Sequence, residues 1–254
     1  MLRRPGNAGG AISNPICMTG AVDFSKRSGQ KELLDRDDIP LRDIEKNMQE
    51  LDVINTWLGG HAISQKGLKQ LIGGRKQVCI CEIGCGGGDN LRVLSQWCQR
   101  HGIAATITGI DNNVHCVAVA RQRWIGDNAE WICADYREVS FTARRPDIIF
   151  SSLFCHHFTD AELIDQLQWM ERNAEIGWFI NDLQRHPLAY YSIRLLTAVF
   201  SRSYLVKNDA PLSVLRGFSR AEWSRLLTAA GMQDCAIGWK WAFRWLVTKK
   251  KNYV

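Results

Sequence analysis

The stretch C-E-I-G-C-G-G-G-D, residues 81–89, decides the fold of this chain. It ends a short apolar run, residues 77–83, and precedes a stretch with helical periodicity, residues 90–100. Glycines at such a strand-to-helix turn allow a tight bend and the close approach of a ligand, because no Cβ intervenes. In an open α/β sheet, ligands bind at the edge where the parallel strands end. The stretch therefore predicts a ligand-binding first strand of an α/β sheet.

The residues at this turn distinguish between possible ligands. The dinucleotide pattern GxGxxG requires glycine at position 89, where the chain has Asp89. Glu82 precedes the glycines, and its negative charge disfavours a pyrophosphate but favours a ligand that carries a sulfonium and an ammonium group. Because glycine-rich turns occur in many α/β proteins, other residues are needed to identify the ligand.

Two more acidic residues follow the next two expected strands. Asp111 ends the strand at 104–110, and Asp135 follows the strand at 130–133. Asp111 can accept hydrogen bonds from both hydroxyls of a ribose, and Asp135 can accept one from an adenine amino group. Either residue could instead cap a helix. Acidic residues at the ends of three successive strands favour a nucleoside ligand.

Strands and helices alternate along most of the chain. Further strands are expected at 147–153 and 177–181, and helices at about 114–124 and 161–173. This alternation predicts an α/β fold, with a mostly parallel sheet, helices on both faces and right-handed crossovers. Residues 234–248 alternate in polarity and are expected to form a terminal hairpin.

Two regions outside this alternation are expected to flank the ligand-binding edge. Residues 31–75 carry amphipathic helical patterns at 41–58 and about 64–72, and predict an N-terminal helical lid. Residues 187–218 contain a helix-like apolar segment followed by a polar stretch with Pro211, and predict a cap insertion after the fifth strand.

The chain is expected to form one domain. Residues 1–30 are rich in Gly, Ser, Asn and Ala and are expected to be a disordered tail. Residues 31–254 are expected to fold as a single unit, since its length suits one α/β domain with a cap.

With these motifs in place, the chain resembles the class I SAM-dependent methyltransferases, which have a Rossmann-like fold, and is similar to ubiquinone-type and natural-product enzymes that act on small molecules. The resemblance covers about 77–183 and rests on E-I-G-C-G-G-G (82–88), G-I-D (109–111), A-D (134–135) and P-D-I-I-F (146–150). It implies a seven-stranded sheet with one antiparallel strand near the C-terminus. It also implies S-adenosyl-L-methionine (SAM) as the cofactor.

The resemblance assigns cofactor-binding roles by position. Gly84 and Gly86 line the site of the methionine part, Asp111 holds the ribose and Asp135 the adenine. The other residues expected in the cofactor site are neighbours of these motif positions: Glu82, Cys85, Asn112, Tyr136 and Ser151.

Histidines supply the candidate catalytic residues. L-F-C-H-H-F, residues 153–158, looks like the Leu-His-His segment that follows the fourth strand of such enzymes, with the leucine shifted by two residues. His156 and His157 would then lie where the acceptor approaches the methyl group. A phenolic acceptor, with a pKa of about 10, would benefit from a histidine base. Either histidine could instead pack structurally or cap the next helix. His186, after the fifth strand, is a third candidate.

The expected reaction is O-methylation of an aromatic or polyketide-like small molecule in secondary or quinone metabolism. C- or N-methylation of a similar molecule, and methylation of RNA or protein, are alternatives. The fourth strand is followed by S-S-L-F, residues 151–154, and not by the Asn/Asp-Pro-Pro-Tyr typical of nucleobase methyltransferases, which disfavours nucleic acid. An oxidoreductase that binds NAD and a SAM-binding protein without catalysis are further alternatives.

Composition and charge limit the partners. The net charge of +6 arises at the chain ends, where residues 1–30 hold four basic residues against one acidic residue and 249–251 are three lysines. No nucleic-acid partner is therefore expected. No uncharged apolar run is long enough to span a membrane, and no secretory signal is seen. Nine cysteines without a C-x-x-C pair indicate a cytoplasmic protein with no metal or redox site.

Overall fold

A seven-stranded sheet forms the centre of the computed structural model, which describes residues 22–36, 38–142 and 144–251. Its strand order is β3-β2-β1-β4-β5-β7-β6. The strands are β1 (Gln77–Ile83), β2 (Ala104–Asp111), β3 (Ala129–Cys133), β4 (Ile148–Ser152), β5 (Gly177–Leu183), β6 (Ala236–Lys240) and β7 (Arg244–Lys250). All pairs from β3 to β5 are parallel, whereas β7 runs antiparallel to β5 and β6. The expected mostly parallel sheet with a terminal hairpin is confirmed.

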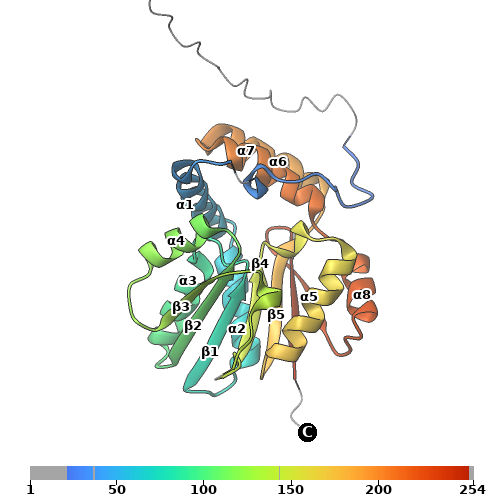
Figure 1. The fold of residues 1–254 in the computed structure, drawn as a ribbon. Coiled ribbons are helices and arrows are strands. Elements are labelled where there is room, and N and C mark those ends of the chain that lie inside the picture. Colours follow the sequence, from blue (N-terminus) through green and yellow to red (C-terminus); the bar gives the residue numbers. More distant parts are fainter. Residues whose placement is uncertain (1–21, 37, 143, 252–254) are drawn as a thin grey trace, which may run out of the picture.

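Helices cover both faces of this sheet (Figure 1). One face packs against α2 (Gly60–Ile72), α3 (Asp89–Arg100) and α4 (Val114–Arg123). The other packs against α5 (Asp160–Asn173) and α8 (Arg220–Ala229). Side chains alternate along a strand. In β1, for example, Ile80 belongs to the first core and Cys81 to the second. The alternation of strands and helices seen in the sequence thus produces two apolar layers.

A third group of elements lies beyond the carboxyl ends of the parallel strands (Figure 1). It consists of η1 (Leu33–Asp35), α1 (Leu41–Trp57), α6 (Pro187–Phe200) and α7 (Tyr204–Arg216). These elements come from the two regions expected to form a lid and a cap. None of the helices in the described part of the chain is long and apolar enough to cross a membrane.

Helix α7 differs from the polar stretch expected around Pro211. Ser203 caps its N-terminus by accepting a hydrogen bond from Val206 N at 3.4 Å. Pro211 lies inside the helix, where it lacks one backbone donor. Burial of Leu205 and Leu212 against the rest of the molecule compensates for that loss. Tertiary packing therefore overrides the local signal of the proline.

Residues 22–36, here called the strap, include residues 22–30 of the expected tail. In the structure these residues are packed. The Arg27 guanidinium donates to Phe158 O at 2.7 Å and forms an ion pair with Asp160 at 3.0 Å. Ser28 N donates to Leu215 O at 3.0 Å. The composition of residues 1–30 favours disorder. Long-range polar contacts such as these cannot be recognised from it, because they produce no hydrophobic periodicity in the sequence. Residues 1–21 lie outside the described residues.

Gly67 sets the distance between helix α2 and the sheet. A Cβ at Gly67 would lie 2.6 Å from the Phe179 ring, which is fully buried on β5. Gly67→Ala is expected to lower the free energy of unfolding by about 1–3 kcal/mol, because the helix must move outward. Urea denaturation measures this change. Gly74→Ala is the control, since its Cβ would meet no atom within 4 Å. Equal stability of both variants would contradict this packing.

Candidate active site

A cavity of about 1290 Å³ opens at the carboxyl edge of the sheet. Residues of the glycine turn, the strap, α1, α6 and α7 line it. Pockets for a single drug-sized ligand usually measure about 300–1,000 Å³, so this cavity has room for two small molecules. Its lining includes two groups of residues that follow neighbouring strands, those of the glycine turn after β1 and the histidines after β4. We call them the glycine end and the histidine end.

The backbone at the glycine end requires glycine. Gly84 has φ +67° and Gly86 has φ +49°, in the left-handed region that favours glycine. A Cβ at Gly84 would lie 2.3 Å from the Phe154 ring. Gly84 N and Cys85 N both donate to Ile110 O, at 2.9 and 3.1 Å, which ties the turn to the end of β2. Gly84, Cys85 and Gly86 all line the cavity.

Asp111 joins the glycine turn to the end of β2. One of its carboxylate oxygens accepts from Gly86 N and the other from Asn113 N, each at 2.9 Å. Burial raises the pKa of Asp111, and these two N–H donors partly oppose that change. A carboxylate offers about four acceptor sites. Asp111 therefore keeps acceptor capacity for a pair of ligand hydroxyls, and Asn112 lines the cavity beside it.

Asp135 and Tyr136, which follow β3, also line the cavity. Arg137 binds the Asp135 carboxylate with its backbone N–H and its guanidinium, both at 2.9 Å, and so lowers the pKa of Asp135. Tyr136 is buried and packs edge-on against Phe154 and Trp169. Asp135 thus lies at the cavity with part of its acceptor capacity already used.

Ser151 is the one expected cofactor residue that the structure does not bring to the cavity. It is fully buried, and its hydroxyl lies 3.6 Å from Cys155 Sγ. Successive side chains on a strand point to opposite faces. Its neighbour Ser152 therefore lines the cavity instead.

Two buried charged residues of the cavity have atoms without partners among the described residues. Glu82 Oε2 accepts no hydrogen bond, and Arg244 has two such nitrogens, Nε and Nη1. Burial raises the pKa of Glu82, helped by Asp89 and Asp111, and burial lowers the pKa of Arg244 to about 10. Buried polar groups usually have partners. An acceptor and donors left free in one cavity suit a ligand with an ammonium and a carboxylate group.

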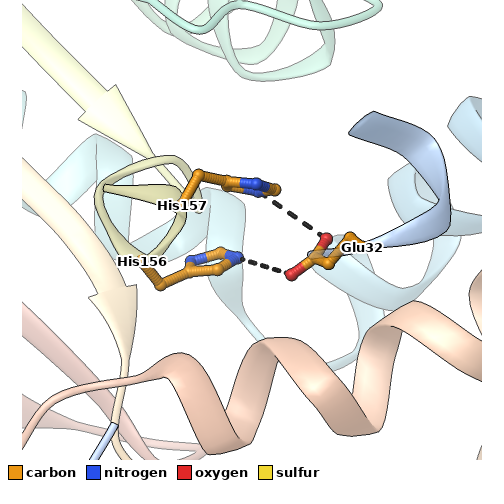
Figure 2. A group of neighbouring side chains, drawn as sticks. All are labelled: Glu32, His156 and His157. Carbon is orange, nitrogen blue, oxygen red and sulfur yellow. Dashed lines mark ion pairs between the residues drawn. The ribbon is translucent and has the colours of Figure 1, made fainter. Parts of the chain in front are cut away.

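At the histidine end, His156 and His157 lie side by side and face Glu32 of the strap (Figure 2). Their ring centroids are 4.5 Å apart. The Nε2 of His156 lies 3.4 Å from one Glu32 oxygen, and the Nε2 of His157 lies 3.7 Å from the other. Glu32 and His156 are buried, and His157 is partly exposed to the cavity.

Further carboxylates hold the other nitrogen of each ring. His156 Nδ1 lies 2.8 Å from Asp182, and His157 Nδ1 lies 3.2 Å from Asp35. Burial by itself lowers the pKa of His156, but the carboxylates of Asp182 and Glu32 outweigh it and raise this pKa to about 9. Burial by itself raises the pKa of Glu32, but the two imidazoles outweigh burial and lower this pKa below its ordinary value, so that Glu32 stays ionised.

The strap and α7 fix the position of this group. Arg216 on α7 donates to His156 O at 3.0 Å and to His157 O at 2.7 Å. Ser213 donates to a Glu32 oxygen at 2.7 Å. The Asp209 carboxylate accepts from the first two backbone N–H groups of η1, at 2.8 and 3.0 Å. The cap insertion therefore orients both the histidine turn and Glu32.

His186 has a different place. Its Nδ1 accepts a hydrogen bond from Leu188 N at 3.1 Å and caps α6, and its ring stacks on Phe243. It does not line the cavity. The structure thus brings two of the three candidate histidines together and leaves the third at a helix terminus.

The sequence analysis did not predict Glu32, Asp35 or Arg244 as site residues. Glu32 and Asp35 lie three positions apart in a polar segment, far along the chain from the histidines. Arg244 begins the last strand. From the sequence, only the need for carboxylates beside His156 and His157 points to residues such as Glu32 and Asp35.

Comparisons with known proteins agree with this geometry. Residues 80–177 match a family described as "Methyltransferase domain". The plantazolicin methyltransferase BpumL in complex with SAH is similar in structure, with 22% identity, TM-score 0.57, and coverage of 78% of this chain and 72% of that chain. Human N-acetylserotonin methyltransferase in complex with SAM has 17% identity, TM-score 0.57, and coverage of 84% and 57%. The comparison with curated proteins found no match.

At these identities the likeness to solved structures shows the fold, and the family match adds the domain type. Residues 80–177 therefore contain a methyltransferase domain, and the sheet has the fold of the similar solved methyltransferases. This agrees with the SAM-dependent methyltransferase expected from residues 82–88.

Proposed function

We propose that this enzyme transfers the methyl group of SAM to an oxygen atom of a small aromatic or polyketide-like molecule. The observation that carries the proposal is that one cavity is lined both by the glycine turn and by the histidine turn. Its glycine end suits an amino acid and a nucleoside, and its histidine end holds a buried cluster of imidazoles and carboxylates.

The glycine end offers a place for each part of SAM. Glu82 would bind the ammonium group, since one of its oxygens is free and buried. Asp111 would hold the ribose hydroxyls, and Asp135 lies where it could receive the adenine amino group. Bound there, SAM supplies a methyl group that is already activated for displacement.

Apolar side chains also line the cavity. They come from α1 and the residue after it (Met48, Leu51, Ile54, Leu58), from α6 (Ile193, Leu196) and from the segment before β7 (Phe243). Such walls suit an aromatic or other bulky apolar acceptor. The names of two of the similar structures mention plantazolicin and N-acetylserotonin, and neither name indicates a nucleic acid.

The histidine end would prepare the acceptor oxygen. With its Nδ1 directed at Asp35, 3.2 Å away, His157 would present Nε2 to the cavity as an acceptor. It would take the proton of a hydroxyl held near Nε2 and Glu32, while SAM, when bound, would supply the methyl group to the hydroxyl oxygen. Holding both reactants in line and excluding water supplies much of the rate.

The test is a methyl-transfer assay with SAM and a panel of phenols, catechols and hydroxylated polyketides. We expect release of S-adenosylhomocysteine, with the new methyl group on oxygen by mass spectrometry and NMR. Methylation only on carbon or nitrogen would contradict O-methylation. Turnover only with RNA or protein would contradict the small-molecule acceptor.

A further inference from the structure

The spacing of Glu32, His156 and His157 is unusual for a hydrogen-bonded group. Charge-assisted N–H···O bonds measure about 2.7–2.9 Å. The two contacts between the Nε2 atoms and Glu32 measure 3.4 and 3.7 Å, although the same rings make a contact of 2.8 Å to Asp182 and one of 3.2 Å to Asp35. The rings are thus close to Asp182 and Asp35 but further from Glu32, and Figure 2 shows the two long contacts to Glu32.

We propose that Glu32, His156 and His157 form a binding site for one divalent transition-metal ion of the Zn²⁺ type. Two ligands bound tetrahedrally at 2.0–2.2 Å lie about 3.3–3.6 Å apart, which is close to the two observed separations. One ligand atom from each residue falls in a group whose members are all within 4.8 Å of one another. Two imidazoles and one carboxylate are a common ligand set for such ions.

The outer contacts support the site independently. A histidine that binds a metal usually donates its other ring N–H to a carboxylate or carbonyl, which fixes the tautomer and points the lone pair at the ion. His156 has this arrangement through Asp182, and His157 has it through Asp35. Both histidines are therefore oriented with Nε2 toward the same point beside Glu32.

The charges at the histidine end also suit a dication. Three carboxylates, those of Glu32, Asp35 and Asp182, surround the two rings. The nearby guanidinium of Arg216 is bonded to backbone carbonyls of the histidine turn. A dication in the middle would neutralise two of these negative charges.

A second cluster in the described chain provides a contrast. Asp52, His61 and Asp89 also lie close together. There, His61 Nε2 approaches Asp89 to 2.8 Å, and Asp52 is paired with Arg92 at 2.7 Å. Ordinary hydrogen bonds and an ion pair account for that cluster, so no ion site is assigned to it.

The ion would have positions open toward the cavity, because all three ligands line it. Metal sites with three protein ligands keep a position for water or substrate. This role rests on the proposed function: the ion would bind the acceptor oxygen and lower the pKa of its hydroxyl. With the ion bound, His157 Nε2 would be a ligand in place of a base, and the hydroxyl proton would pass to water in the cavity. Binding of the ion does not depend on the identity of the acceptor.

The test uses the full chain after removal of metals with a chelator. Co²⁺ is added and followed by visible absorption, and Zn²⁺ is added and followed by calorimetry. We expect one equivalent of each ion per chain. Glu32→Gln and His157→Ala should weaken binding at least about tenfold. His101→Ala is the matched control, since that ring packs on Trp97 away from the cavity.

Several outcomes would overturn the site. They are no Co²⁺ binding by the unmodified chain, undiminished binding in both variants, or thiolate-to-cobalt absorption that indicates cysteine ligation. Thermal unfolding of each variant shows whether it is folded, and Glu32→Gln keeps the size of the side chain. Full methyl transfer after chelation, with no Co²⁺ bound, would reject the site and leave the proposed function intact. Ion binding without methyl transfer to any hydroxyl would reject the proposed function and leave the metal site intact.

Discussion

His157→Ala is expected to lower kcat for methyl transfer about 100-fold or more, while the affinity for SAM stays unchanged. The substitution removes the imidazole that faces the cavity beside Glu32, and it leaves the glycine turn and Asp111 in place. The acceptor hydroxyl then lacks a group to take its proton or to hold an ion. Steady-state kinetics with a phenolic acceptor and calorimetric titration with SAM measure the two quantities.

The control for this variant is His101→Ala, which removes an imidazole at the C-terminus of α3. It should keep the kcat of the unmodified enzyme. Full activity of His157→Ala would exclude a role of this ring in the reaction. Equal losses of activity and of SAM affinity would mean that the variant has damaged the cavity as a whole.

Asp111→Ala is expected to weaken SAM binding by about 1–3 kcal/mol, which is roughly a 5- to 150-fold rise in Kd. It would leave the ribose hydroxyls without their acceptor. It would also free Gly86 N–H, which Asp111 now holds at 2.9 Å. Calorimetry with SAM measures the change. Asp111→Asn should lose less, because the amide oxygen can still accept a hydrogen bond.

Asp127→Ala is the matched control for Asp111→Ala, because Asp127 is an exposed carboxylate that does not line the cavity. Its SAM affinity should equal that of the unmodified protein. An unchanged Kd for Asp111→Ala would contradict the assignment of the ribose to this residue.

The fold and the glycine end could be predicted because their signals are local. A strand, a glycine turn and a helix follow one another within residues 77–100, and Asp111 ends the next strand. Parallel pairing then brings the ends of β1 and β2 together without further information. Every expected cofactor residue except Ser151 lines the cavity, and the side chain after Ser151, that of Ser152, lies on the cavity side of the strand.

The histidine end could be predicted only in part. The sequence indicated His156 and His157, but their partners come from two other segments. Glu32 and Asp35 belong to the strap, and Asp182 belongs to β5. Such contacts form only when the complete fold brings the segments together, and a polar segment such as 22–36 carries no periodic pattern that reveals them. His186 shows that a histidine which follows a strand need not belong to the site, because its ring caps helix α6.

The strap has a consequence for how the acceptor enters the cavity and how the product leaves it. It is held by side-chain hydrogen bonds, an ion pair and the backbone hydrogen bond from Ser28 N to Leu215 O, and it contributes no strand to the sheet. We therefore expect it to detach at lower free energy than global unfolding requires. Such a local opening would remove Glu32 from the histidines and expose the acceptor compartment, while the glycine turn stays as it is. The product could then leave, and a new acceptor could enter, through the opening left by the segment that carries Glu32.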